Sequence, residues 1–254
     1  MGLYKLTLAT IFHRKVWVVA LLCVFLFPII LPHLTPVDVN PALLEPARAQ
    51  AAWYTLWAVS ILWGLFQAAR FGDDTASSAM GSYFLSRGTK RISQMAQIWL
   101  ACVTFLLPLL LVTLAICLIG ALPEAAEEGI WIAMNFQYAL IYVITIVPLI
   151  LLAISLGSRF GGMISYLVSA GLWVYGMYGV GYLRMMTEIR ANALSDWIYL
   201  ISPHYHLSDM TPRLMFMQGA MLSNEYLEVL TYFAGVALML MALSIFAYKA
   251  KPSS

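Results

Sequence analysis

The charged residues of this 254-residue chain alternate in sign around six apolar stretches. A membrane-spanning helix needs about 20 mostly apolar residues. Stretches at about 16–32, 52–69, 96–120, 130–156, 162–183 and 229–248 reach that length. The connections between them are alternately basic and acidic, which is the pattern of a polytopic membrane protein. We therefore predict an all-α polytopic membrane protein with six transmembrane helices in a single transmembrane domain, residues 1–254.

The orientation of the spans follows from the distribution of Lys and Arg. Cytoplasmic loops carry the excess of basic residues, and ten of the 14 basic residues lie on the side that holds both termini. Ten of the 12 acidic residues lie on the other side, and only Asp73 and Asp74 accompany the basic ones. The ten basic residues are Lys5, Arg14, Lys15, Arg70, Arg87, Lys90, Arg91, Arg159, Lys249 and Lys251. Both termini are therefore expected in the cytoplasm.

Several classes of function find no support in the composition. Charged residues make up 10% of the chain, against about a quarter in soluble domains, and no soluble catalytic domain fits between the spans. No Asp, Glu, Lys or Arg lies in the middle of a span, where ion-driven carriers usually place an ionisable group. The interior polar groups are hydroxyls and the amides of Gln67, Asn135 and Gln137. Since no P-loop motif is present, the chain is not expected to be an enzyme by itself, and any ATP would bind another subunit.

The segments outside the spans carry further expectations. Residues 2–15 mix apolar and basic side chains, which indicates an interfacial helix or, alternatively, a positively charged flank. Four prolines near 33–50 predict an extended outer loop. In the outer segment 184–228, we expect one or two short outer-leaflet helices, one of them capped at Thr211-Pro212. The first span is expected to be retained, because a possible cleavage box at 47–49 lies too far beyond it.

The segment 71–93 is the longest cytoplasmic connection. Asp73, Asp74 and Thr75 favour the start of a helix, and residues 76–85 continue it until Gly88. Exposed apolar clusters tend to mark interfaces, so an apolar triplet followed by a basic cluster indicates a docking helix. The triplet is Tyr83, Phe84 and Leu85, and the cluster is Arg87, Lys90 and Arg91. The positive-inside pattern alone is the alternative explanation for Lys90.

Two further patterns have both a functional and a structural interpretation. Gly161, Ser165, Ser169 and Gly176 in the fifth span allow close helix packing, either at a dimer interface along a transport path or within one chain. On the outer side, imidazole and thioether groups suit copper. However, such methionines more often form an apolar face, and no complete ligand set can be named, so we expect no metal site. The outer groups are His204, His206, Asp209, Met210, Met215, Met217 and Met221.

The segment Gly81-Ser-Tyr-Phe-Leu-Ser-Arg-Gly-Thr-Lys-Arg91 and the third span that follows it resemble the membrane subunits of ABC exporters of the type 2 permease family. Those subunits carry a cytoplasmic coupling helix between spans two and three, an N-terminal interfacial helix, six spans, and short helices between spans five and six. The likeness extends over most of the chain and includes Ser202-Pro203-His204.

The resemblance implies the permease subunit of an ATP-binding cassette exporter in a bacterial inner membrane. Six spans would be half of a transporter, so a homodimer or heterodimer of permease subunits is expected, with two copies of a separate ATPase that binds ATP and Mg. Beyond these subunits and the lipid bilayer, no nucleic acid partner is expected, and no cofactor in this chain. The ATPase-coupling residues would be Gly81, Tyr83, Phe84, Leu85, Ser86, Arg87, Gly88 and Arg91. An ATP-independent channel or carrier, or a membrane anchor for an ATPase, is the alternative.

Overall fold

The computed structural model describes residues 2–34, 41–123, 127–189, 193–216 and 218–249. Helices account for nearly all of these residues, and no strand occurs among them. The helices are α1 (Leu3–His13), α2 (Val16–His33), α3 (Pro41–Val59), η2 (Ser60–Gly64), α4 (Leu65–Ser77), α5 (Ala79–Ser86), α6 (Arg91–Ala115), η3 (Ile116–Gly120), α7 (Glu128–Phe160), α8 (Gly162–Val174), η4 (Tyr175–Gly179), α9 (Val180–Ile189), α10 (Ala193–Ile201), η5 (Tyr205–Ser208), α11 (Thr211–Met215) and α12 (Ser223–Ala247).

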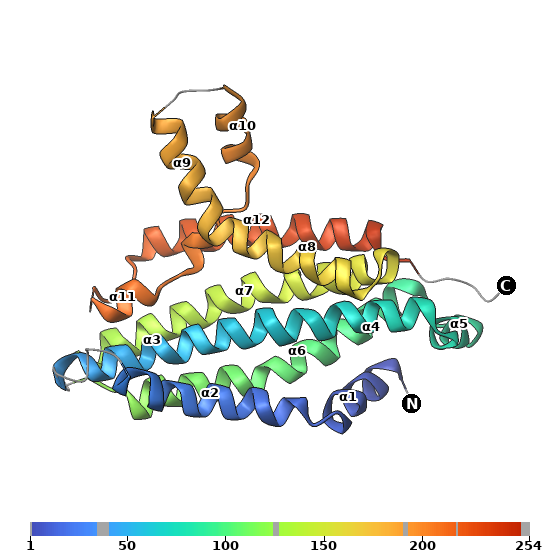
Figure 1. The fold of residues 1–254 in the computed structure, drawn as a ribbon, viewed down its shortest axis with the longest axis horizontal. Coiled ribbons are helices and arrows are strands. Elements are labelled where there is room, and N and C mark those ends of the chain that lie inside the picture. Colours follow the sequence, from blue (N-terminus) through green and yellow to red (C-terminus); the bar gives the residue numbers. More distant parts are fainter. Residues whose placement is uncertain (1, 35–40, 124–126, 190–192, 217, 250–254) are drawn as a thin grey trace.

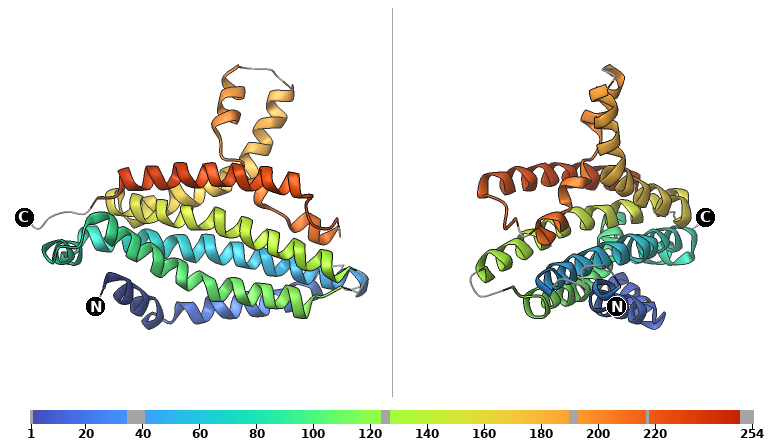
Figure 2. Two further views of the ribbon diagram at one scale, coloured as in Figure 1. Left: turned by 180° about the vertical axis from the view of Figure 1, so that it is seen from behind. Right: turned by 60° about the vertical axis from the view of Figure 1, so that its left-hand side comes forward.

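The long helices run roughly parallel to one another and form an elongated bundle (Figures 1 and 2). The short helix α5, the start of α1 and the end of α12 lie at one end of this bundle, which we call the α5 end. The start of α7 and helix α11 lie at the opposite end, the α11 end. Both described chain ends therefore share the end that carries α5.

Among the described residues, five helical segments are long and apolar enough to cross a membrane: Val16–His33, Arg91–Gly120, Glu128–Phe160, Gly162–Met186 and Ser223–Ala247. The chain is thus an all-α protein with multi-pass membrane character. These segments coincide with five of the six expected spans. The expected span at 52–69 also lies in helix, since α3, η2 and α4 follow each other without a break, but the count of six spans stays a prediction.

The structure corrects the expectation that residues 33–50 form an extended loop. Helix α2 continues through Pro28 and Pro32 to His33, and α3 already begins at Pro41. Proline is tolerated at the first helical position, because its missing N–H has no intrahelical partner there. Pro46 lies inside α3, as prolines do in many membrane helices. Part of this loop, 35–40, lies outside the described residues.

Helix α7 is the centre of the bundle and packs against α4, α6, α8 and α12. Its approach to α4 is closest near the α5 end, where two glycines meet the opposite backbone. A Cβ on Gly72 would overlap the carbonyl of Ile154, and a Cβ on Gly157 would overlap the carbonyl of Ala69. Small residues at such positions let membrane helices pack backbone to backbone. This part of the α4–α7 contact therefore depends on glycine.

Towards the α11 end, large aromatic side chains join α3 to α7. The indole N–H of Trp53 donates to Asn135 Oδ1 at 3.0 Å, and that of Trp57 donates to the hydroxyl of Tyr138 at 3.1 Å. Trp53 stacks on Tyr138 with ring centroids 4.1 Å apart. Because no water is available in a bilayer, buried polar groups must find partners in the protein. The indole N–H groups of Trp53 and Trp57 therefore each pair with a polar side chain of α7 along the α3–α7 contact.

The apolar segment Gly162–Met186, at the position of the expected fifth span, leaves the bundle before it ends. After the π-helical turn η4, helix α9 projects away from the bundle, and α10 returns beside it (Figures 1 and 2). Helix α9 runs to Ile189, beyond the expected end of the span at residue 183. Short helices were expected in this region, but Thr211 is the first residue of α11 and not its cap. The N-cap is Met210, and the carboxylate of Asp209, one residue earlier, accepts from the Thr211 N–H at 3.0 Å.

Candidate functional site

The short helix α5 has well-defined ends. Ser78 is its N-cap, and its hydroxyl accepts a hydrogen bond from the Met80 N–H at 3.3 Å. The helix stops where Gly88 adopts a φ of +82°, a left-handed conformation that glycine adopts without strain. The Gly88 N–H donates to Leu85 O and the Thr89 N–H to Phe84 O, both at 2.9 Å. This is the Schellman arrangement of a helix C-terminus.

The expected start of this helix was wrong. Asp73, Asp74 and Thr75 lie inside α4, which continues to Ser77. Asp73 instead accepts a hydrogen bond from the Gly162 N–H at 2.9 Å, at the beginning of α8. Asp74 lies 3.9 Å from the guanidinium of Arg14. Both carboxylates therefore bind other parts of the chain, and the α5 helix begins one turn later.

Close backbone packing fixes α5 against the bundle. Gly81 is buried, and a Cβ at this position would overlap the carbonyl of Thr75. The side-chain amide of Gln94 on α6 donates to the carbonyls of Gly81 and Thr89, at 3.2 and 3.4 Å. Phe84 and Leu85 are half-buried and pack against the core. Three of the predicted docking residues, Gly81, Phe84 and Leu85, thus hold the helix in place.

The face of α5 that points away from the bundle is aromatic and cationic. The side chain of Tyr83 is 49% exposed, and the guanidinium carbon of Arg87 lies 4.8 Å from the centroid of its ring. Ser86, Gly88, Lys90 and Arg91 are also exposed. A cation over an aromatic face is a favourable contact at an exposed site. The predicted residues Tyr83, Ser86, Arg87, Gly88 and Arg91 are therefore all accessible on α5 or shortly after its C-terminal end, and together we call them the α5 surface.

A second feature of the α5 end is the position of Arg14, which the sequence did not predict. Its Nη1 donates to Gln67 Oε1 at 3.2 Å, its Nη2 lies 3.9 Å from Asp74, and its guanidinium lies 5.8 Å from the Phe71 ring centroid. Arg14 thereby ties the end of α1 to α4, close to α5. The sequence signal was an isolated pair of acidic residues on an otherwise basic side.

The small residues predicted for the fifth span contact other parts of the same chain. Ser165 and Ser169 are buried, and the Ser165 hydroxyl donates to Ala153 O on α7 at 2.5 Å. Gly161 has a φ of +91° at the turn between α7 and α8. A Cβ on Gly176 would overlap Tyr205 and the carbonyl of Pro203. These contacts are made inside one chain, and a contribution of the four residues to a dimer stays a prediction.

The interior amides are all engaged in structural contacts. Gln67 accepts from Arg14, and Asn135 accepts from Trp53 and donates to Trp131 O at 3.0 Å. Gln137 accepts from the Met221 N–H at 2.8 Å and donates to Met221 O at 3.1 Å. Within the described part of the chain, none of these three side chains is left to line a polar path.

His204 and His206, which were expected on the outer side, are also involved in local structure. The backbone N–H of His204 donates to the hydroxyl of Tyr232 at 2.7 Å, and the ring atom His204 Nε2 lies 3.2 Å from Tyr199 O. Burial, followed by the charge of the neighbouring His204, lowers the pKa of His206. Within residues 2–34, 41–123, 127–189, 193–216 and 218–249, no three His, Cys, Asp or Glu side chains group as metal ligands. Met217 lies outside the described residues.

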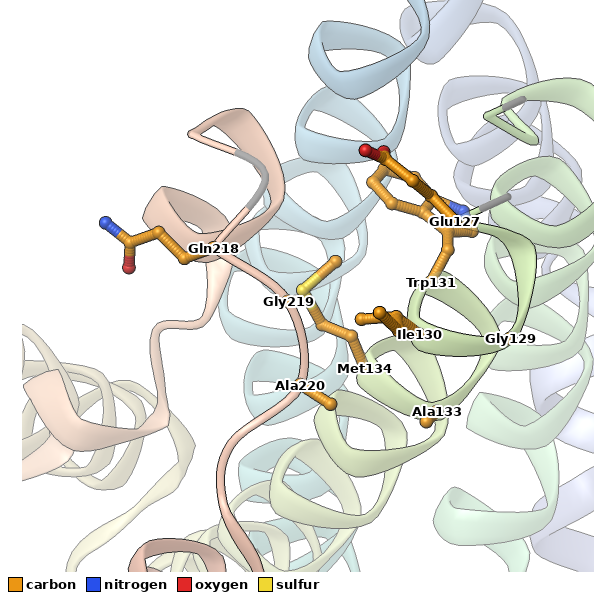
Figure 3. Close-up of a pocket in the computed structure, with 9 residues that line it drawn as sticks. All are labelled: Glu127, Gly129, Ile130, Trp131, Ala133, Met134, Gln218, Gly219 and Ala220. Atoms are coloured by element: carbon orange, nitrogen blue, oxygen red, sulfur yellow. The ribbon is translucent and has the colours of Figure 1, made fainter. Parts of the chain in front are cut away.

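A cavity of about 510 Å³ lies at the α11 end, between the start of α7 and residues 218–220 (Figure 3). Ile130, Trp131 and Met134 line its α7 side, and Ala220 lies opposite. Among the described residues that line it, Glu127 is the one acidic residue. This lining offers no nucleophile beside a base, and the cavity therefore gives no indication of catalysis.

Comparison of the chain with family models, with curated proteins and with solved structures finds no match.

Proposed function

We propose that this chain is the permease subunit of an ATP-binding cassette exporter. The observation that carries the proposal is the α5 surface. A helix that is capped at both ends and held by backbone packing presents an exposed tyrosine and arginine beyond the end of the bundle. Tyrosine and arginine are among the residues that most often dominate protein–protein binding. The sequence lacks a P-loop of its own, and the partner that supplies ATP hydrolysis would be a separate ATPase.

The contacts of α5 supply a route by which movement of an ATPase could reach the bundle. Helix α5 follows α4 directly at Ser78, and α4 packs closely on α7 through Gly72 and Gly157. Packed helices move as rigid elements. ATP binding that closes a pair of ATPases would displace α5, and α4 would pass the movement to α7 and α8. In this proposal Gly81 keeps α5 and α4 in register, and the α5 surface binds the ATPase.

The remaining parts of the proposal follow from the same arrangement. In this proposal the helical stretch 41–77 would contain the second of six spans, and the α5 end would face the cytoplasm, because most of the basic residues were assigned to that side. Two permease subunits, identical or related, would enclose the export path in a bacterial inner membrane. Two ATPase subunits, each with ATP and Mg, would bind their α5 surfaces.

The alternatives receive less support. A channel or carrier needs polar groups along its path, whereas Gln67, Asn135 and Gln137 are each bonded within the chain. A membrane anchor for an ATPase would use the same α5 surface without a transport path. It is distinguished from an exporter by whether substrate moves when the ATPase is bound.

The test is affinity purification from the native membrane in mild detergent, followed by mass spectrometry. We expect an ABC-type ATPase to co-purify with the wild type. The pair of substitutions Tyr83→Ala and Arg87→Glu should reduce its recovery about tenfold or more, as expected for removal of two dominant contacts. Both side chains are exposed, and the variant should fold normally. Phe84 is a poorer choice because it is half-buried.

The matched control is Arg159→Glu, which reverses an exposed charge on α7 near the α5 end. It should leave recovery of the ATPase unchanged. If no nucleotide-binding protein co-purifies with the wild type in repeated trials, the chain acts without an ATPase and the proposal fails. Equal losses in the Arg159 control and the α5 variant would show that the effect comes from charge and not from the α5 surface.

A further inference from the structure

An apolar groove of about 400 Å³ runs along the outside of the bundle between α2 and the α3–η2 segment. Val16, Val19, Cys23, Phe27 and Leu31 line it from α2. Its other side is lined by Tyr54, Thr55, Ala58, Val59, Leu62 and Trp63. Among these described lining residues, the polar side-chain groups are the Tyr54 and Thr55 hydroxyls, the Trp63 indole N–H and the Cys23 thiol. The Thr55 hydroxyl already donates its proton to Ala51 O, at 2.7 Å, within its own helix.

The length of the groove matches a lipid tail. Val16 and Leu31 are 15 positions apart on α2, and a rise of 1.5 Å per residue gives about 22 Å. One leaflet of the hydrocarbon core is about 15 Å thick, half of the whole. A single acyl chain that enters at Val16 therefore fits within the groove.

The end of the groove at Val16 is basic. Lys15, immediately before Val16, is exposed, and its φ of +56° makes the sharp turn between α1 and α2. Its side chain forms no ion pair or hydrogen bond with the described residues. The neighbouring Arg14, in contrast, donates a hydrogen bond to Gln67 and forms an ion pair with Asp74. His13 and Lys5 are exposed on α1, and residues 1–34 contain no acidic residue. The positive charge at this end is therefore not neutralised by its own segment.

The aromatic residues at the same turn place it at the membrane interface. The Trp17 indole N–H donates to Phe12 O at 3.1 Å, and the Trp17 ring meets that of Phe12 edge to face at 5.5 Å. Tryptophan is enriched at the level of the lipid head groups. Lys15 and the start of the groove therefore lie where the phosphate of a lipid meets its acyl chains.

We propose that this groove binds one anionic phospholipid from the leaflet at the α5 end. The phosphate lies at Lys15, and one acyl chain lies along α2 between Val16 and Leu31. Charge selects the head group, since each Lys or Arg near a membrane surface contributes to attraction of anionic lipid. The groove retains the lipid, because a chain seated there contacts two helices. The proposal requires that the chain lies in a membrane but does not depend on an ATPase partner.

The test is native mass spectrometry of the purified protein in detergent, with dioleoyl phosphatidylglycerol and dioleoyl phosphatidylcholine added separately. We expect one tightly held phosphatidylglycerol and weaker binding of phosphatidylcholine. Lys15→Gln should weaken the binding of phosphatidylglycerol about fivefold and leave phosphatidylcholine unchanged. Lys249→Gln, another exposed lysine near the α5 end, is the matched control and should have no effect.

A second pair of variants tests the groove. Cys23→Trp fills it and should reduce the retention of both lipids, whereas Val18→Trp, on α2 outside the groove lining, should not. Thermal unfolding of both variants in detergent checks that they fold. Equal binding of the two lipids by the wild type, or full retention by Cys23→Trp, overturns the proposal. So does a wild-type dimer that Cys23→Trp dissociates, because the groove would then hold a second copy of the chain.

Discussion

Two helices of similar apolar character, α7 and α2, differ greatly in burial. In their most apolar 18 residues, 72% of the positions of α7 are buried, against 22% of those of α2. Helix α7 lies inside the bundle and is covered by four other helices, whereas α2 lies on its surface (Figure 1). The hydrophobicity that identifies both as spans therefore does not tell which one is central.

The polar and small residues of the two helices do make this distinction. Helix α7 carries buried Asn135, Tyr142 and Ser155 as well as Gly157, while α2 contains no Ser, Thr, Tyr, Asn or Gln. Lipid is as apolar as leucine, so membrane helices associate through close packing and hydrogen bonds and not through exclusion of water. A central membrane helix is thus recognised by its small residues and by its polar side chains, whose hydrogen bonds lipid cannot supply.

The largest effect is expected from Gly157→Leu at the closest point of the α4–α7 contact. Its side chain would overlap the carbonyl of Ala69, and α4 and α7 would have to separate. Since overpacking a tight contact costs about 1 to 3 kcal/mol and sometimes more, we expect a loss of about 3 kcal/mol or failure to accumulate. Unfolding in SDS, followed by circular dichroism, measures it. Gly171→Leu, on α8 where a Cβ meets open space, is the control and should be tolerated.

A leucine pair tests the comparison directly. Leu149→Ala removes a fully buried side chain of α7 and should cost about 2 kcal/mol through the cavity left behind. Leu22→Ala on α2, where the side chain is 50% exposed, should cost less than about 0.5 kcal/mol. Both values come from the same SDS titration. Similar costs for the two substitutions would mean that α2 is covered in the folded protein, for example by a second subunit.

Most of the helical framework could be predicted from the sequence, because long apolar runs with few charges have few other structures available. Five of the expected spans overlap the apolar helices. The predictions failed where a residue preference that holds for local sequence was overridden by the residue's position in a helix or by its contacts with distant residues. Pro41 was taken as a sign of extended chain but begins α3. Asp73 and Asp74 were taken as a helix start but bind Gly162 and Arg14.

The candidate site was predictable in composition but not in orientation. The sequence identified an aromatic and basic segment between two spans, and Tyr83 and Arg87 do lie together on its surface. Which of three consecutive apolar residues faces outward depends on how α5 is rotated against α6. The bonds from Gln94 to Gly81 and Thr89 set this rotation, and they join residues whose spacing in sequence carries no recognisable signal. The link from Arg14 to α4 likewise spans 53 positions.

The smallest effect is expected from Tyr142→Phe, in the region where aromatic residues join α7 to the α3–η2 segment. Ser60 donates its hydroxyl proton to Leu56 O at 2.7 Å, so Tyr142 is the donor in its 2.6 Å bond to Ser60 Oγ. Side-chain hydrogen bonds between membrane helices contribute about 0.6 kcal/mol on average. A double-mutant cycle of Tyr142→Phe and Ser60→Ala in the SDS titration should give a coupling of about that size. A coupling of zero would show that ring packing, such as the edge-to-face contact of Tyr142 with Trp57, and not hydrogen bonding, holds α7 to this segment.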